Sequence, residues 1–213
     1  MNILNILFPK RCPYCSNVME LDNKYCCDNC KSFFTIKVID NKLANSICVS
    51  PFIYGEKYKQ AILNYKFHNK PYYSKQLANA LFKCINTYYK DLTFDVVTCV
   101  PLSKKSLQTR QYNQSKLLAK NIAKHLDINY LDLLTKFKCN SPQHTLPRDQ
   151  REKNVIGVYK VTEKYKDNNF INVLLIDDIM TTGYTLQECV RTIKHHYNCN
   201  VFCATLAVVP SKR

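Results

Sequence analysis

The chain has 213 residues, a formal net charge of +15 and twelve cysteines. This length accommodates one domain with a substantial core plus a small module, and no apolar run approaches the roughly 20 residues that span a membrane. The opening MNILNILF is too short for a secretory signal and lacks a small-residue cleavage site, so we expect a cytoplasmic protein with reduced cysteines. The positive charge comes mostly from scattered lysines. It fits either a solvated surface or a footprint for nucleic acid or a phosphorylated ligand.

Four cysteines near the N-terminus form two C-x₂-C pairs, Cys12 with Cys15 and Cys27 with Cys30, separated by eleven residues. Each pair turns two thiolates toward one point, and two pairs complete a tetrahedral site that selects Zn²⁺. Four protein ligands leave no open position, so the metal would be structural. Cys26 adjoins Cys27, and we favour Cys27 because it keeps the C-x₂-C spacing. A redox pair and coincidental buried cysteines are the alternatives.

Residues 1–48 contain these cysteines and little periodic pattern, so we expect a metal-stapled module there and a second domain over residues 49–213. Most later cysteines fall in apolar patterns and are expected to be small core residues. Two helices are predicted after Glu56 from apolar residues at helical spacing. These residues are Tyr58, Ala61, Ile62 and Tyr65, then Leu77, Leu81, Cys84, Ile85 and Tyr88. Lys66, His68 and Lys70 form a basic tip between the two helices.

A short apolar strand over residues 95–100 precedes the polar stretch PLSKKSLQTRQYNQ, which is predicted to be a loop before a helix over residues 117–126. Ser103, Lys104, Lys105 and Arg110 offer donors and positive charge that suit a pyrophosphate. An exposed basic loop is the alternative. A second polar block, SPQHTLPRDQREKN (residues 141–154), precedes a predicted strand over residues 155–159.

The most informative stretch is VLLIDDIMTTGYTL, residues 173–186. Four apolar residues predict a strand buried on both faces, and Asp177 and Asp178 are expected to follow it. A helical pattern begins at Leu186, so the loop between them opens a helix N-terminus, which suits a phosphate. Two carboxylates beside a phosphate require hydroxyls or a divalent cation. A phosphorylated sugar with Mg²⁺ satisfies both requirements, whereas an N-cap cluster of Asp and Thr is the alternative.

Strands and helices alternate through the second domain, with a further apolar strand over residues 201–209. This pattern predicts an α/β fold with a mostly parallel sheet flanked by helices. Ligands bind such sheets beyond the carboxyl ends of the strands, where both polar loops are expected.

The stretch over residues 173–186 resembles the phosphoribosyl pyrophosphate (PRPP) loop of type I phosphoribosyltransferases: an apolar strand, two acids, then T-T-G-x-T. The resemblance implies that Asp177 and Asp178 contact the ribose hydroxyls. It also implies that the loop holds the 5′-phosphate, through Thr181, Thr182, Gly183, Tyr184 and Thr185. The block over residues 141–154 stands where such enzymes usually carry a mobile flap, although a solvent loop fits it equally.

The chain resembles the ComF family over nearly its whole length. The resemblance rests on FPKRCPYC, NYKFHNK, VPLSKKSLQTRQYNQ, PQHTLPRDQREKN and VLLIDDIMTTGYTL, in this order. The family pattern R-G-F-N-Q is matched here by Arg110, Asn113 and Gln114, while Gln111 replaces the glycine. The third block also matches at Gln143, Leu146, Arg151 and Asn154. The resemblance implies a competence factor for DNA uptake that handles single-stranded DNA, with PRPP as ligand and DNA-uptake machinery as partner.

Three functions stay open at this point. The first is a factor that binds PRPP–Mg²⁺ and single-stranded DNA, with exposed tyrosines (Tyr65, Tyr72, Tyr73 or Tyr112) stacking on bases. The second is an active phosphoribosyltransferase acting on a nucleobase or an amine, in which Mg²⁺ and Arg110 hold the leaving pyrophosphate and Asp177 and Asp178 orient the ribose. The third is a regulator that senses PRPP without turnover.

Overall fold

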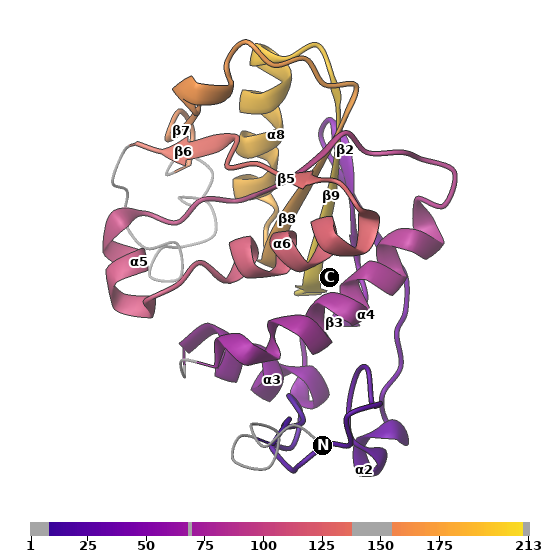
Figure 1. Ribbon diagram of the computed structural model, residues 1–213. Helices are drawn as coiled ribbons and strands as arrows, with labels where there is room; N and C mark the ends of the chain where they lie inside the picture. Colours follow the sequence, from indigo (N-terminus) through magenta and orange to yellow (C-terminus); the bar gives the residue numbers. More distant parts are fainter. Residues whose placement is uncertain (1–8, 68–69, 138–154, 211–213) are drawn as a thin grey trace.

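A computed structural model describes residues 9–67, 70–137 and 155–210 (Figure 1). Its main sheet has the order β1-β2-β9-β8-β4-β5, and β3 also pairs with β9. All pairs in this sheet are parallel except the β1–β2 hairpin. The strands are β1 (Ile39–Leu43), β2 (Ser46–Ser50), β3 (Phe52–Ile53), β4 (Val96–Cys99), β5 (Asn129–Tyr130), β8 (Asn172–Met180) and β9 (Asn200–Val208). A separate antiparallel pair consists of β6 (Leu134–Lys136) and β7 (Tyr159–Val161).

Helices cover both faces of this sheet. They are α2 (Asp28–Lys31), α3 (Glu56–Phe67), α4 (Ser74–Tyr88), α5 (Lys104–Arg110), α6 (Gln114–Leu126) and α8 (Tyr184–His196), with 3₁₀ turns η1 (Pro71–Tyr73) and η3 (Glu163–Tyr165). Alternate residues of β8 point to opposite faces. Leu174 and Ile176 pack in the same cluster as α4 and α6, whereas Val173 and Leu175 pack with α8. The central strand is therefore buried on both sides, and the predicted mostly parallel sheet flanked by helices is confirmed.

The apolar patterns locate α3, α4, α6 and α8 as expected, and the described residues hold no helix with both the length and the apolar character of a membrane span. Two local predictions are wrong. The stretch between β4 and α6 is not a continuous loop, because residues 104–110 form α5. None of the α5 residues is buried, so no apolar period marked this helix in the sequence. The strand expected over residues 155–159 is a turn, since Gly157 adopts a φ of +66°, and β7 begins only at Tyr159.

The N-terminal segment, residues 9–38, lies beside α3 at the opposite end of the molecule from α8 (Figure 1). Tyr14 joins this segment to the main fold, with ring centroids 5.9 Å from Tyr58 of α3 and 6.4 Å from Phe52 of β3. Residues 39–50, by contrast, belong to the sheet. The domain boundary expected after residue 48 falls inside β2, whose residues Cys48 and Val49 pair with β9.

Candidate functional site

A cavity of about 910 Å³ opens beyond the carboxyl ends of β4 and β8. It brings together most of the site residues predicted from the sequence: Ser103, Lys105, Arg110, Asp177, Asp178, Thr181, Thr182, Gly183 and Thr185. Lys104 and Tyr184 are not part of its lining, although Tyr184 is the first residue of α8. The residues come from the two loops that the alternation of strands and helices placed at this edge of the sheet.

Asp177 and Asp178 lie within β8, so the prediction that the strand ends before them is wrong. Strand β8 continues to Met180 because β9 pairs with it along this whole length, including Asp177 with Thr205 and Met180 with Val208. Each carboxylate is held by a different contact. Asp177 Oδ1 accepts hydrogen bonds from Ser115 Oγ at 2.7 Å and from the Asp178 backbone N–H at 2.8 Å. The Asp178 carboxylate is buried and contacts Lys66 Nζ.

The environment of Asp177 disfavours its charged form. Burial raises the pKa of the Asp177 carboxyl to about 7, and the neighbouring Asp178 adds to the rise. The hydrogen bond from Ser115 and the charge of Lys66 act in the opposite direction. Burial and a neighbouring like charge both disfavour an ionised carboxylate, which accounts for the raised pKa of Asp177.

The loop after β8 ends in Gly183, which caps α8 with a φ of +81°. A Cβ at this position would lie 2.9 Å from Leu43 Cδ2, so both the backbone angle and the β1–β2 hairpin favour glycine. Thr181, Thr182 and Thr185 line the cavity beside this cap. The N-terminus of a 13-residue helix thus faces the cavity, with backbone N–H groups and hydroxyls suited to an anion.

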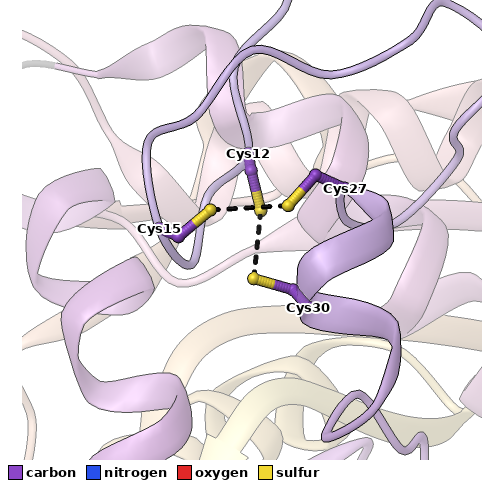
Figure 2. A group of neighbouring side chains, drawn as sticks. All are labelled: Cys12, Cys15, Cys27 and Cys30. Atoms are coloured by element: carbon purple, nitrogen blue, oxygen red, sulfur yellow. Dashed lines mark hydrogen bonds between the residues drawn. The ribbon is translucent and has the colours of Figure 1, made fainter.

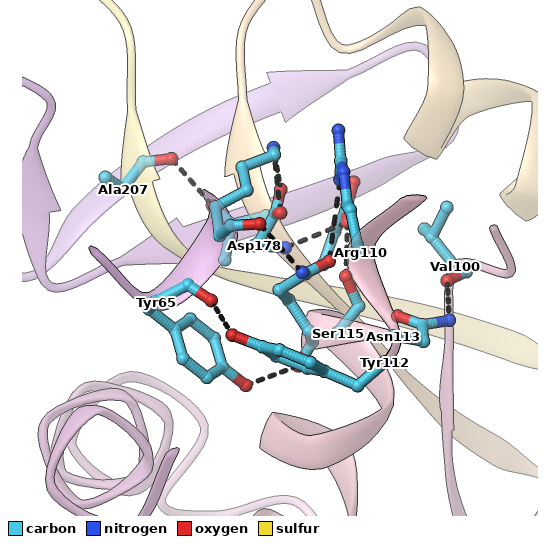
Figure 3. A network of polar contacts seen from close by, with 12 residues as sticks. Tyr65, Val100, Arg110, Tyr112, Asn113, Ser115, Asp178 and Ala207 are labelled. Atoms are coloured by element: carbon cyan, nitrogen blue, oxygen red, sulfur yellow. Dashed lines mark hydrogen bonds and ion pairs between the residues drawn. The ribbon is translucent and has the colours of Figure 1, made fainter. Parts of the chain in front are cut away.

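Residues 113–115, at the start of α6, connect three parts of the cavity (Figure 3). Asn113 caps α6 by accepting from the Lys116 N–H, and its Nδ2 donates to the Val100 carbonyl at 3.2 Å. Gln114, which is fully buried, donates through Nε2 to the Lys66 carbonyl at 3.1 Å. Ser115 then holds Asp177. This motif therefore fixes the β4 end, the α3 end and the acid pair at once.

Three residues that precede residues 113–115 in the chain also have defined positions. Arg110 lies over the Phe67 ring at 5.1 Å, and its Nη1 is 3.5 Å from Gln114 Oε1. Gln111 ends α5 with a φ of +65°, a conformation that favours glycine. This left-handed backbone conformation explains why the R-G-F-N-Q pattern has glycine at this position. In this chain Gln111 adopts the left-handed conformation instead. Ser103 caps α5 by accepting from the Ser106 N–H at 3.1 Å.

Two residues that line the cavity were not predicted from the sequence. Lys66 was placed in a basic tip with no partner, and Ser115 directly follows the recognised motif without having been singled out. The expectation about exposed tyrosines is wrong for Tyr65 and Tyr73, which are fully buried. Tyr112 is half-buried, with its hydroxyl donating to the Tyr65 carbonyl, and Tyr72 is 51% exposed. His68 and the block over residues 141–154, including Gln143, Leu146, Arg151 and Asn154, lie outside the described residues.

The sulfurs of Cys12, Cys15, Cys27 and Cys30 converge on one point in the N-terminal segment (Figure 2). All four lie within 4.8 Å of one another, with Sγ–Sγ distances of 3.8 Å for Cys12–Cys30 and 3.4 Å for Cys15–Cys27. A tetrahedral ion with Zn–S bonds of 2.3 Å separates its sulfurs by about 3.8 Å, so the group fits such an ion. Cys26 is buried next to this group without joining it.

Local contacts shape both halves of the group. In the first half, the Cys12 N–H donates to Asn17 O at 2.8 Å, and Ser16 turns the chain with a φ of +65°. In the second half, Cys27 is the N-cap of α2, and the Cys30 N–H donates to Cys27 O at 3.0 Å. Three of the four cysteines are buried, and Cys15 is exposed.

Comparisons with known proteins show what the chain is similar to. Residues 113–213 match the model of the phosphoribosyl transferase domain, and this region includes the acid pair and the α8 loop. Together with the mostly parallel sheet, this match describes residues 113–213 as a phosphoribosyltransferase-like domain.

The chain is also similar to Competence protein F of Haemophilus influenzae (strain ATCC 51907 / DSM 11121 / KW20 / Rd), with 27% identity over 146 residues. The alignment covers 66% of this chain and 63% of the relative. The chain is therefore similar to Competence protein F and spans less than two thirds of that relative's length. Among solved structures, an adenine phosphoribosyltransferase aligns with 67% of this chain and 82% of its own, with a TM-score of 0.38 and 12% identity.

Proposed function

We propose that this protein is a cytoplasmic competence factor that binds PRPP–Mg²⁺ in the cavity and handles single-stranded DNA during natural transformation. The observation that carries the ligand is the juxtaposition of an acid pair with a helix N-terminus and cationic side chains in one cavity. The similarity to Competence protein F supports a role in competence. For this role we propose the DNA-uptake machinery as partner.

The chemistry of the lining residues suggests one orientation for PRPP in the cavity. Asp177 and Asp178 accept hydrogen bonds from the ribose hydroxyls, while residues 181–185 donate to the 5′-phosphate. Ser103, Lys105 and Arg110 lie on the pyrophosphate side, where Arg110 offers a planar contact to phosphate oxygens. Mg²⁺ prefers oxygen ligands and would neutralise pyrophosphate charge there. This assignment uses every predicted cavity residue in the role that its chemistry suits.

A second candidate function is transfer of the ribose 5-phosphate to an acceptor. Leu63, Phe67 and Tyr54 form an apolar wall of the same cavity, and such a wall suits a flat acceptor ring. In that case Asp177 and Asp178 orient the ribose, and Arg110 stabilises the departing pyrophosphate. Pyrophosphate release from PRPP, screened over nucleobases and amines, separates this function from binding alone. Release with any acceptor above the rate of PRPP hydrolysis establishes the transferase.

The four-cysteine group supports a structural Zn²⁺ ion. Four thiolates complete a tetrahedral shell without an open position, so the ion would stabilise the N-terminal segment and take no part in chemistry. The contacts of Tyr14 with Tyr58 and Phe52 place this segment against α3 and β3.

Binding of single-stranded DNA would rest on the net charge of +15 and on exposed aromatic rings. Tyr72 is the member of the predicted tyrosine set whose ring is most accessible, at 51% exposed. Because lysine contacts to phosphates release counterions, we expect the affinity to fall steeply with salt.

The test is a titration of labelled single-stranded DNA at two salt concentrations, with and without PRPP–Mg²⁺. It is repeated with the variant D177A/D178A. Salt-sensitive binding that PRPP modulates in the natural protein alone supports a DNA-handling factor with a linked ligand site. Absence of DNA binding in every condition contradicts it and favours a small-molecule transferase or a sensor.

A further inference from the structure

One cation reaches the acid pair from a distant part of the chain. Lys66, in the last turn of α3, lies 2.9 Å from Asp178 Oδ1 and 2.8 Å from Asp178 Oδ2. The two side chains are 18% and 9% exposed, so the contact is shielded from water. It is a charge-assisted contact to both oxygens, inside the cavity and not on the outer surface.

The position of Lys66 is fixed by its backbone. Its carbonyl accepts from Gln114 Nε2 at 3.1 Å, and the hydroxyl of the preceding Tyr65 donates to the Gln114 carbonyl at 2.7 Å. Tyr112 donates to the Tyr65 carbonyl (Figure 3). Tyr65 and Gln114 are fully buried, so the last turn of α3 is locked to the start of α6. The ammonium is thus delivered by a rigid support.

A second lysine–aspartate pair provides a contrast. Lys116 contacts Asp132 at 2.6 Å, but these side chains are 37% and 48% exposed, and neither residue lines the cavity. Solvent screens such a pair, and its contribution to stability is small. The Lys66–Asp178 pair combines burial, contact with both oxygens and a position at the proposed ligand, which the Lys116–Asp132 pair lacks.

The electrostatics of the cavity give Lys66 a role. Two adjacent carboxylates repel a pyrophosphate unless positive charge lies between them and the ligand, and this positive charge is usually supplied by a divalent cation. Here the protein supplies part of it through a side chain that already contacts Asp178. Each Asp178 oxygen keeps further acceptor capacity, so a hydroxyl group can bind while the ion pair persists.

We propose that Lys66 is the resident counter-ion of the acid pair, a positioning residue that holds the Asp178 carboxylate in place in the cavity and so lowers the Mg²⁺ requirement for an anionic sugar phosphate. This inference rests on the proposed binding of PRPP. Burial and the neighbouring Asp178 raise the pKa of Asp177, and the charge of Lys66 lowers it, as a counter-ion next to the acid pair would.

Calorimetric titration with PRPP over a series of Mg²⁺ concentrations tests the proposal. The series starts from a buffer depleted of Mg²⁺, prepared without a chelator because a chelator would also remove zinc. We expect K66M to lose at least tenfold in affinity at the lowest Mg²⁺ and to recover most of it at the highest. K66R keeps the cation and stays within about threefold of the natural protein. K116M removes the other ion pair and leaves the affinity unchanged.

An equal affinity of K66M and the natural protein at every Mg²⁺ concentration overturns the inference, as does a loss that Mg²⁺ does not change. If the natural protein binds no PRPP at any Mg²⁺ concentration, the proposed function fails, and with it the ligand role of Lys66. The two failures are therefore distinguishable.

Urea unfolding of K66M, D178N and K66M/D178N tests the pair without any ligand. We expect each single variant to unfold at lower urea than the natural protein, and the double variant to recover most of the loss because it leaves no unpaired buried charge. If K66M alone does not fold, a folded double variant supports the pair. Additive losses, or a double variant that does not fold, overturn the proposed pairing.

Discussion

The four-cysteine segment and the acid-pair cavity are built in opposite ways. The four sulfurs come from residues within 18 positions of one another, Cys12 to Cys30, and are shaped by local hydrogen bonds. The cavity joins Lys66 to Asp178 and Ser115 to Asp177, pairs separated by 112 and 62 positions. With the proposed zinc ion, the cysteine segment would depend on one metal, whereas the cavity is supported by many separate contacts. Loss of one support should therefore collapse the first region and only loosen the second.

The largest expected effect is on the cysteine segment. Binding of structural zinc contributes about 10 kcal/mol or more to folding in zinc-finger peptides, so we expect C12S to lose zinc and the segment to unfold. Zinc content and the melting temperature measure this effect. The matched control is C26S, which alters a buried cysteine outside the four-sulfur group and keeps the metal. Zinc loss with an unchanged melting temperature would contradict a structural role.

A smaller effect is expected where the cavity depends on backbone conformation. G183A forces a side chain onto a φ of +81° and brings its Cβ to 2.9 Å from Leu43 Cδ2, so we expect a loss of about 1–3 kcal/mol and weaker PRPP binding. G157A has a φ of +66° but nothing within 4 Å, and isolates the backbone strain. Urea unfolding and PRPP calorimetry measure both variants. Equal PRPP affinities of G183A and the natural protein would show that the loop does not hold the phosphate.

The supports of the acid pair should each contribute still less. S115A removes the 2.7 Å hydrogen bond to Asp177, and we expect a loss of about 1 kcal/mol together with a further rise in the pKa of Asp177. T87A, which removes a hydroxyl bonded to the backbone of an exposed helix turn, controls for hydroxyl loss. Urea unfolding at pH 8 measures the stability. A loss of several kcal/mol for S115A would show that the cavity, like the cysteine segment, depends on a single support.

The pH dependence of stability provides the finest comparison. The folded pKa of Asp177, about 7, exceeds the unfolded value near 3.9, so the folded state binds more protons between these values and loses stability as pH rises through them. We expect D177N to remove this part of the decline and to be more stable than the natural protein above pH 7, with the difference vanishing below about pH 4. D167N alters an exposed aspartate as control. Urea unfolding at several pH values from 4 to 8 measures the free energy of unfolding of each variant. If this free energy changes with pH equally in D177N and the natural protein, the pKa of Asp177 is not raised.

Much of this molecule follows from local sequence. Apolar runs and helical spacing predicted β8, α4, α6 and α8, because burial selects side chains at fixed periods. The spacing of the cysteine pairs predicted their convergence, and residues 177–185 predicted a cavity beside a helix N-terminus. In each case neighbours in the chain are neighbours in space. Local rules failed where an element had no apolar face, as in α5, or where pairing with β9 extended β8 past the acids.

The tertiary structure alone decided how the cavity is neutralised and supported. No local pattern says that Lys66 pairs with Asp178, or that Gln114 and Ser115 hold α3 and Asp177. The burial of Tyr65 and Tyr73, which appeared in the sequence as candidates for base stacking, is likewise a result of packing. A residue type limits which contacts a side chain can make, but only the folded chain brings two distant segments within 3 Å and shields them from water. The sequence therefore determined the class of site, and the fold determined its charge balance.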